Sequence, residues 1–347
     1  MKKTLLALAA VAASSAAFAQ SSVTLYGVVD ASLESVKGDK TVTRVSSDNL
    51  VSSRLGFKGS EDLGGGMKAN FVLEAALAVD TGETKKDRFF DRAAWVGIAG
   101  GFGELRLGHQ DTSIGVLAGN IAILGAQAYD DLKIAKTFSG DGYRRTDNAI
   151  TYVLPKLVDG LSAQVQYSTA ADYTKTDNGE TAGSKRGEHY GLNVQYAANG
   201  FSAGLGYISA KNDVAGDIKD TGLLAYLGYD FGVAMLSGYY EQDKTSGAAE
   251  KLKLYGVRVN VPVTKDFGLQ ASFSQVKDAT KADNVEDDAK IFALKGVYNL
   301  SKRSSVYALY TNVSNDDGVA LKVGSSVPAL TKGERSSGFA IGVSHKF

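Results

Sequence analysis

The sequence contains no cysteine and only three prolines in 347 residues. Without cysteine the chain cannot carry the disulfide framework that many small secreted folds depend on. Proline cannot donate a hydrogen bond to a β-ladder, so its scarcity suits long, paired strands. The prolines present, Pro155, Pro262 and Pro328, fall at predicted strand ends or in loops. A single closed sheet would hold such a chain together without disulfides.

The chain also lacks an excess of either charge and any long apolar run. It has 38 Lys and Arg residues against 38 Asp and Glu residues. A nucleic-acid partner would require a basic face, so none is expected. After residue 20, no segment approaches the roughly 18 consecutive apolar residues of a membrane-spanning helix.

The first residues have the pattern of a targeting segment. Lys2 and Lys3 are followed by a short apolar run from Leu5 to Ala13, and Ala17-Phe18-Ala19 fits a small-residue cleavage site. Residues 1–19 are therefore predicted to be a cleaved signal peptide, which leaves residues 20–347 as one domain.

The dominant pattern after this segment is alternation with a period of two, which is typical of β-strands. Near the end of the chain, Phe339, Ile341 and Val343 share one face, while Gly338, Ala340, Gly342 and Ser344 share the other. The same alternation occurs at 71–77, 161–168 and 267–274. A soluble β-sandwich would alternate as well, so the pattern alone does not indicate a membrane.

The connections distinguish the two folds. Short Gly- or Asn-containing turns are predicted at 63–66, 100–103, 155–160, 198–200, 230–232, 262–268 and 299–303. Long polar segments lie between them at 37–50, 80–87, 111–145, 169–187, 211–220, 242–250, 277–289 and 313–334. Strict alternation of seven short and eight long connections predicts a 16-stranded antiparallel transmembrane β-barrel, with short periplasmic turns and long extracellular loops.

Strand length and aromatic residues agree with this interpretation. A hydrocarbon band of about 25 Å crossed at about 40° requires about 10 residues per strand. Aromatic residues next to the short turns are typical of the girdle at a membrane interface; they are Phe57, Phe102, Tyr196, Phe201, Tyr229, Phe231, Phe267, Tyr298 and Phe347. The strands at 88–99 and 304–312 carry apolar residues on both faces, as would occur at a contact with another subunit.

Several motifs resemble the general porins of β-proteobacteria. They are Ser22-Val23-Thr24-Leu25-Tyr26-Gly27, the segment from Ser53 to Gly66, Gly103–Gly108, Asp147–Tyr152 and Gly342–Phe347. The resemblance implies a trimer of 16-stranded barrels, a third loop folded into each pore and a terminal Phe347 that the barrel-assembly machinery reads. It further implies contact with outer-membrane lipid and lipopolysaccharide, and passive transport of small hydrophilic solutes and ions.

The functional site of such a channel would be its constriction, where charges set the field across a narrow aqueous passage. The longest loop, 111–145, contains an apolar stretch from Ile114 to Ala128, which favours an inward fold with a helical turn near Ile121–Leu124 over a loop that covers a subunit contact. The predicted basic side comprises Arg54, Lys58, Lys68, Arg88, Arg92, Arg106, Arg145 and Arg258. The predicted acidic side comprises Glu74, Glu104, Asp111, Asp130 and Asp131, with Asp141 as a further candidate on the loop. The excess of arginine predicts a weak preference for anions.

Enzymatic and metal sites have little support in the sequence. His109, His189 and His345 fall on separate strands or at their ends, so neither a catalytic triad nor a zinc cluster is predicted, and no cofactor is expected. The acidic run of Asp283 and residues 286–288 has side chains that could bind a divalent cation, but it lacks the spacing of an EF-hand. A solvated outer loop is the favoured interpretation, so no metal site is predicted. Two alternatives remain. A substrate-specific channel would want an aromatic ladder in the lumen, and an outer-membrane hydrolase would want an acid, base or nucleophile cluster at the rim.

Overall fold

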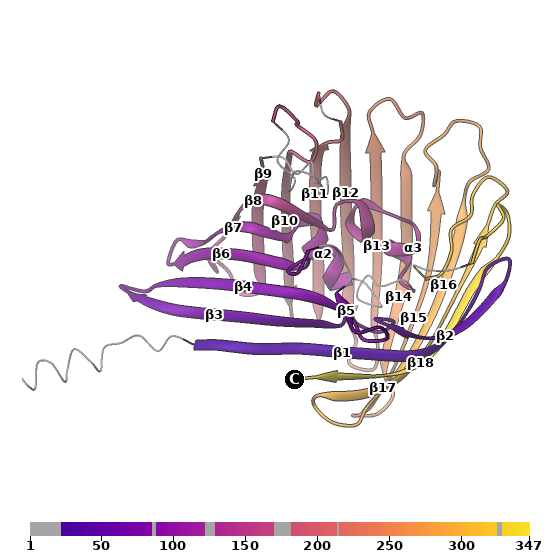
Figure 1. Ribbon diagram of the computed structural model, residues 1–347, viewed down its shortest axis with the longest axis horizontal. Helices are drawn as coiled ribbons and strands as arrows, with labels where there is room; N and C mark the ends of the chain where they lie inside the picture. Colours follow the sequence, from indigo (N-terminus) through magenta and orange to yellow (C-terminus); the bar gives the residue numbers. More distant parts are fainter. Residues whose placement is uncertain (1–21, 85–87, 122–128, 170–181, 214, 325–327) are drawn as a thin grey trace, which may run out of the picture.

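The computed structural model describes residues 22–84, 88–121, 129–169, 182–213, 215–324 and 328–347, and the predicted signal peptide lies outside these ranges. The chain forms an antiparallel β-sheet that closes on itself (Figure 1). Closure occurs where β1 (Ser22–Lys37) pairs with β18 (Ser336–Lys346), in a register that runs from Val28 opposite Lys346 to Lys37 opposite Ser337. A closed sheet leaves no unpaired edge strand.

The wall has sixteen strands, as predicted. β2 (Thr41–Ser47) and β3 (Arg54–Gly64) both pair with β1 and form two parts of one wall strand, and β5 (Glu83–Thr84) is a short addition to β4. The next wall strands are β4 (Met67–Ala78), β6 (Ala93–Gly100), β7 (Gly103–Asp111), β8 (Arg145–Val153), β9 (Leu161–Ser168), β10 (His189–Ala198) and β11 (Phe201–Lys211). The remaining strands before β18 are β12 (Lys219–Asp230), β13 (Met235–Thr245), β14 (Leu252–Pro262), β15 (Phe267–Lys277), β16 (Ala289–Asn299) and β17 (Ser304–Asn315).

One predicted long loop is largely wall strand instead. The segment 37–50 was expected to be a polar connection, but β1 continues to Lys37 and β2 begins at Thr41. Val36 pairs with Val42 and Leu33 pairs with Val45, so β-branched and apolar residues continue the ladder past the expected strand end. The chain leaves the sheet only after Ser47, where Asp48 has a φ of 70° and Asp30 Oδ1 accepts a hydrogen bond of 3.0 Å from the Asn49 backbone.

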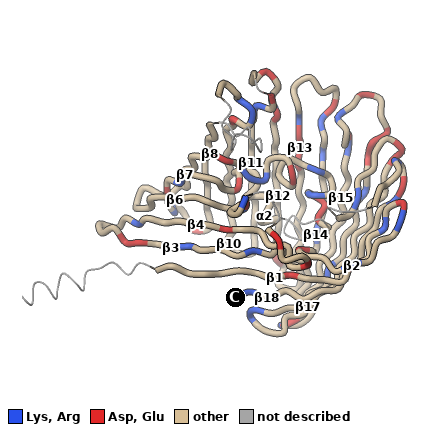
Figure 2. Tube along the Cα trace, viewed as in Figure 1, with Lys and Arg blue, Asp and Glu red and all other residues tan. Residues whose placement is uncertain are grey.

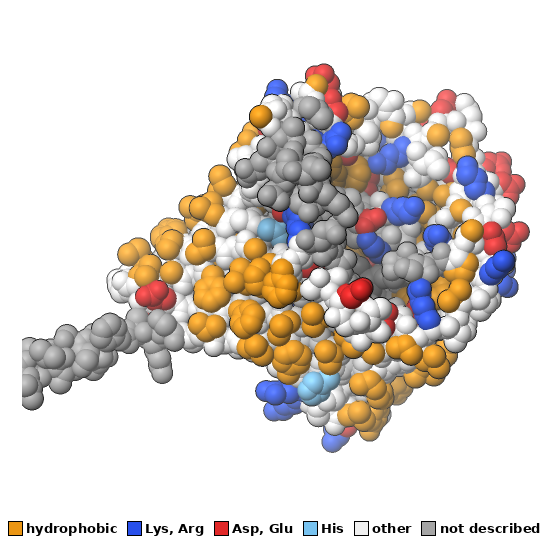
Figure 3. All heavy atoms as spheres, viewed as in Figure 1, with side chains coloured by type: hydrophobic (Ala, Val, Ile, Leu, Met, Phe, Trp, Pro, Cys, Tyr) orange, Lys and Arg blue, Asp and Glu red, His pale blue; other side chains and the backbone are white. Residues whose placement is uncertain are grey.

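The two faces of the wall separate as the alternation predicts. Leu105 and Leu107 are 43% and 49% exposed on the outside, whereas their neighbour Arg106 interacts with side chains inside the barrel. Hydrophobic side chains gather over β3 and β4 in the space-filling view, and charged side chains line the hollow beside them (Figure 3). Acidic and basic residues recur along the long connections at the upper edge (Figure 2).

The inward apolar residues of the two strands with apolar character on both faces pack inside the barrel, and a subunit contact through their outer faces stays a prediction. On β6, the inward Trp95 lies under the Arg106 guanidinium, with 4.6 Å from the ring centre to the guanidinium carbon. On β17, the inward Tyr307 and Leu309 are buried in a hydrophobic cluster inside the barrel. Their apolar character therefore serves packing within one chain.

The long connection between β7 and β8 folds into the barrel, as predicted. It carries α2 (Ser113–Ile121), α3 (Asp131–Ile134) and the π-helical turn η1 (Phe138–Gly142). Small wall residues make room for α2, because a Cβ atom at Gly204 would lie 2.6 Å from Leu117 Cδ1. Helix α2 begins earlier than the helical turn expected near Ile121–Leu124, and residues 122–128 lie outside the described part of the chain.

A second long connection adds to the interior. Val319, Leu321 and Val323, which follow β17, are buried in the same hydrophobic cluster as Tyr129 of the β7–β8 loop. Apolar packing of two loops therefore fills one side of the barrel. Within the described residues, no helix has the length and hydropathy needed to cross a membrane.

Candidate functional site

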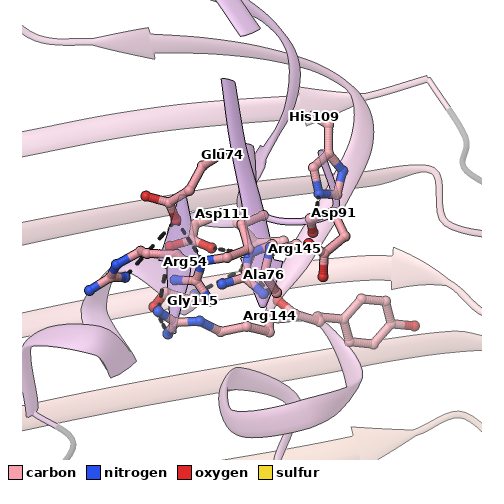
Figure 4. A network of polar contacts seen from close by, with 12 residues as sticks. Arg54, Glu74, Ala76, Asp91, His109, Asp111, Gly115, Arg144 and Arg145 are labelled. Atoms are coloured by element: carbon pink, nitrogen blue, oxygen red, sulfur yellow. Dashed lines mark hydrogen bonds and ion pairs between the residues drawn. The ribbon is translucent and has the colours of Figure 1, made fainter. Parts of the chain in front are cut away.

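A charged network lies inside the barrel at the level where the β7–β8 loop leaves the wall (Figure 4). Glu74 on β4 is one of its centres, with Oε1 lying 2.6 Å from Arg92 Nε and 4.0 Å from Arg54 Nη1. The Tyr26 hydroxyl donates a hydrogen bond of 2.9 Å to the other carboxylate oxygen. The alternation predicted that Arg54 and Glu74 face the lumen; the structure brings both together with Arg92.

The second centre is Asp111, which the structure places at the end of β7. Arg145, the first residue of β8, is its ladder partner, and Arg145 Nε lies 3.0 Å from Asp111 Oδ1. Arg144 Nη2 lies 3.4 Å from Asp111 Oδ2, and the same guanidinium donates to the Gly115 carbonyl at the start of α2. Arg144 was not predicted, because it stands outside the strand whose alternation identified Arg145.

These two centres form a set that we call the waist cluster, consisting of Arg54, Arg92, Arg144, Arg145, Glu74 and Asp111. Four guanidinium groups face two carboxylates, so the cluster carries an excess of positive charge. All six side chains retain contact with water, with side-chain exposure between 12% and 33%. A partly hydrated cationic cluster can attract an anion while leaving it able to move on.

Arg144 and Arg145 of the waist cluster also line a cavity of about 1190 Å³, which Arg88, His109 and Asp147 line as well. Arg88 Nη1 lies 2.5 Å from Asp147 Oδ1, and His109 Nδ1 lies 2.6 Å from the same oxygen. Asp91 accepts a hydrogen bond of 2.8 Å from the Ala76 backbone, which holds the chain before β6 against β4. Acidic and basic side chains both line this cavity, and neither sign of charge is in clear excess.

The predicted residues nearer the short turns form separate contacts. Arg106 Nε donates to Glu104 at 2.7 Å, and Asn70 donates to the same carboxylate at 2.8 Å. The Lys58 ammonium lies 5.3 Å from the centre of the Tyr26 ring. Lys68 is exposed and is the ladder partner of Asp62 near the turn after β3. None of these residues contacts the β7–β8 loop in the interactions described.

Three predicted residues are buried between the loop and the opposite wall. Asp131 is fully buried and lies 2.7 Å from Arg258 Nη2 on β14, and the Arg258 guanidinium stacks on the Tyr239 ring at 4.2 Å. Tyr239 also donates a hydrogen bond to Asp131. Asp130 is buried as well and caps α3 by accepting from the Leu132 backbone at 3.1 Å. The inward parity of Arg258 was inferred correctly, but the loop that carries Asp130 and Asp131 covers it.

Two wall carboxylates that were not predicted hold the same loop. Glu241 on β13 accepts hydrogen bonds from the Ser139 backbone at 2.9 Å and from its hydroxyl at 2.5 Å. Asp243 accepts from the Phe138 backbone at 2.7 Å. Glu241 and Asp243 alternate inward near the long-loop end of β13, and this pattern could have indicated that the loop attaches there.

Two tyrosines of the loop complete this attachment. Tyr129 donates to Glu34 on β1 at 2.9 Å, and Tyr143 donates to Asp220 on β12 at 2.8 Å. Burial, followed by the negative charge of the acceptor, raises the pKa of both phenols well above the ordinary value. Both phenols therefore remain hydrogen-bond donors at neutral pH.

The C-terminal residue lies at the seam of the barrel. The Phe347 backbone exchanges two hydrogen bonds of 3.1 Å with Gly27. A Cβ atom at residue 27 would lie 2.3 Å from the Phe347 ring, so only glycine leaves room for the ring there. Phe347 thus contributes to closure of the sheet, and the assembly role stays an implication of the resemblance.

Comparisons with known proteins agree on one family. Residues 5–318 match the family model described as Gram-negative porin. Outer membrane porin protein 32 of Delftia acidovorans is 32% identical over the full length of both chains. The solved structure of an anion-selective porin from Comamonas acidovorans has a TM-score of 0.81 and 27% identity, and covers 94% of this chain and all of its own. OmpT of Vibrio cholerae, solved in a trimer form, has a TM-score of 0.65 and 17% identity over 94% and 99% of the two chains.

Proposed function

Because this chain belongs to the Gram-negative porin family, and so forms a β-barrel channel of the bacterial outer membrane rather than an enzyme, we propose that it conducts small hydrophilic solutes passively with a weak preference for anions. The observation that supports this preference is the composition of the waist cluster. Four arginines face two carboxylates there, and all six side chains are partly hydrated.

The constriction that we propose contains only part of the set of residues predicted from the sequence, together with a few residues that were not predicted. It consists of the waist cluster, with Arg88, His109 and Asp147 above it and Arg106 and Glu104 below it. Asp131 and Arg258 are buried against each other and Asp130 is buried as well, so we place these three charges outside the aqueous path. Lys58 and Lys68 lie towards the short turns and would act only on ions that leave the pore.

Two properties of the relatives bear on the remainder of the proposal. A structural relative of this chain is described as anion-selective, which agrees with the excess of arginine. The fold is shared with OmpT of Vibrio cholerae, which was solved as a trimer, and we propose a homotrimer here. We also propose contact with outer-membrane lipid and lipopolysaccharide through the apolar outer face, and recognition of Phe347 by the barrel-assembly machinery.

Neutralising the waist cluster tests the proposal. Arg54→Gln combined with Arg145→Gln removes two of the four positive charges, and we expect the zero-current potential across a planar bilayer in a salt gradient to shift towards cations. A unit charge at 4 Å is worth about 1 kcal/mol in water, or about a fivefold change in the permeability ratio. Arg303→Gln, at an exposed short turn, is the matched control. A shift of equal size in this control would contradict the proposal.

Swelling of liposomes in a size series of neutral sugars tests the passive transport itself. Swelling rates should fall smoothly with solute size and show no saturation with concentration. Saturation by one sugar would favour the substrate-specific alternative. Heating a detergent extract before electrophoresis tests the trimer, which should appear as a band that collapses to the monomer.

A further inference from the structure

Three carboxylates meet in the outer loop between β15 and β16, away from the waist cluster. Asp278, Asp287 and Asp288 each place a carboxylate oxygen within 4.8 Å of the other two. Among the described residues, this is the one group of His, Cys, Asp and Glu side chains with spacing suited to a metal ion. Like charges at this separation repel unless cations compensate them.

Lysines compensate two of the three carboxylates. Lys253 Nζ lies 2.9 Å from Asp278 Oδ2, and Lys277 forms an ion pair with Asp288. Both pairs are partly exposed, with side-chain exposure of 23–38%. Asp287 forms no ion pair in the described part of the chain. The group therefore retains one negative charge, which belongs to its most buried member.

The Asp287 side chain is buried and has one carboxylate oxygen without a hydrogen-bond donor from the residues that the structure describes. Its residue exposure is 1%, and its Oδ2 accepts a hydrogen bond of 2.6 Å from the Thr280 backbone and another from the Thr280 hydroxyl. Its Oδ1 is also buried but has no hydrogen-bond partner among the described residues. A buried carboxylate oxygen without a donor or cation is costly, so this oxygen calls for a ligand.

The backbone around the group is fixed on both sides. Gly318 donates to the Glu286 carbonyl at 2.7 Å, and Asp316 donates to the Asp288 carbonyl at 2.9 Å. On the other side, the Asp278 backbone donates to Asp288 Oδ1 at 3.2 Å. The oxygens are thus held in place by neighbouring loops rather than by the ion, which lowers the entropic cost of binding.

We propose that Asp278, Asp287 and Asp288 bind a divalent cation, with Ca²⁺ favoured over Mg²⁺. Carboxylate oxygens are the ligands that hard cations prefer, and an irregular loop site suits the flexible coordination of Ca²⁺ better than the strict octahedron of Mg²⁺. Entry of the ion would require the partly exposed Lys253 and Lys277 to give up these two ion pairs. The favoured interpretation as a solvated outer loop fits Asp283 and Glu286, which are exposed, but not Asp287, which is buried.

Isothermal titration of the purified, EDTA-treated protein in detergent with CaCl₂ tests the site. We expect one saturable site per chain, with half-saturation at about 0.1–1 mM as in extracellular calcium modules, and weaker binding of MgCl₂. Asp287→Asn should weaken Ca²⁺ binding by at least about tenfold, the difference expected from losing a charged ligand. Asp283→Asn, an exposed change in the same loop, should leave binding unchanged.

A folding check and a second variant distinguish loss of the site from loss of the fold. Heat-dependent migration on electrophoresis shows whether Asp287→Asn still folds, and Asp278→Asn, at a partly exposed residue, provides a second variant with the same expected loss. Absence of saturable Ca²⁺ binding to the wild-type protein would overturn the proposal. Binding that survives both Asp287→Asn and Asp278→Asn would place the ion elsewhere and would overturn it as well.

Discussion

The β7–β8 loop has two aspartates, one at its root and one on its far side, that each form an ion pair with an arginine of the wall, one pair in contact with water and the other buried. At its root, Asp111 and Arg145 lie 3.0 Å apart, and both side chains keep contact with water. On its far side, Asp131 and Arg258 lie 2.7 Å apart, and the two side chains are 0% and 7% exposed. The first pair belongs to a cluster with excess positive charge, whereas the second is a neutral pair sealed from water. Hydration and local charge balance thus separate the pair that we propose to act on ions from the pair that holds the loop.

The largest expected effect comes from breaking the sealed pair. Asp131→Ala leaves Arg258 buried without its partner, and loss of one partner of a buried ion pair costs about 3–5 kcal/mol. We expect the free energy of unfolding in urea to fall by this amount. The fluorescence of Trp95, the single tryptophan of the chain, measures the unfolding. Asp141→Ala, which removes an exposed ion pair with Lys133 on the same loop, should cost less than about 1 kcal/mol.

The same comparison can be sharpened by replacing both partners. Asp131→Leu together with Arg258→Met removes both charges of the buried pair, and such replacements are often neutral or stabilising. The double variant should recover most of the loss in unfolding free energy seen with Asp131→Ala. If both variants lose equal stability, the pair is not what fastens the loop.

A smaller effect is expected at the hydrated cluster. Glu74→Gln removes one of the two carboxylates that offset Arg54 and Arg92, so the anion preference should increase. One unit charge at 4 Å is worth about 1 kcal/mol in water, which predicts about a fivefold rise in the ratio of anion to cation permeability. Glu61→Gln, exposed near a short turn, is the control. A shift of the zero-current potential towards cations in Glu74→Gln would contradict the assignment.

The smallest effect concerns the tyrosine that attaches the loop to β12. Tyr143→Phe removes the hydrogen bond to Asp220 and should lower the free energy of unfolding by about 1 kcal/mol. Because the folded-state pKa of Tyr143 is raised, its stabilising contribution is complete below the unfolded pKa of about 10 and is lost as the pH rises through the folded value. Unfolding at pH about 8 and about 11 should therefore show a steeper alkaline loss in the wild-type protein than in Tyr143→Phe. Equal losses would show that this phenol does not carry the dependence.

The wall could be predicted from the sequence because strand alternation is local. The period of two assigned Arg54, Glu74 and Arg106 to the lumen and Leu105 and Leu107 to the outside, and the structure agrees. Turn chemistry located the seven short connections in the same way. The prediction for 37–50 was wrong because polar residues such as Thr41 and Arg44 are compatible with a strand that continues beyond the expected end.

The site was less predictable, because the path of a long loop is not encoded in local periodicity. Asp131 and Arg258 are 127 residues apart, and only the folded loop shows that they neutralise each other. Arg144 was missed for the same reason, since the residue before a strand has no alternation to assign it. Glu241 and Asp243 alternate inward, but their parity could not show that Ser139 and Phe138 cover them.

We propose that the excess of arginine in the waist cluster sets the ion preference of this channel. The zero-current potential of the purified wild-type protein in a planar bilayer, under a KCl gradient, tests it most directly, because K⁺ and Cl⁻ have nearly equal mobilities in water. We expect the sign of a preference for chloride, and a larger potential at low salt, where screening is weaker. A potential with the sign of a preference for potassium would contradict the account.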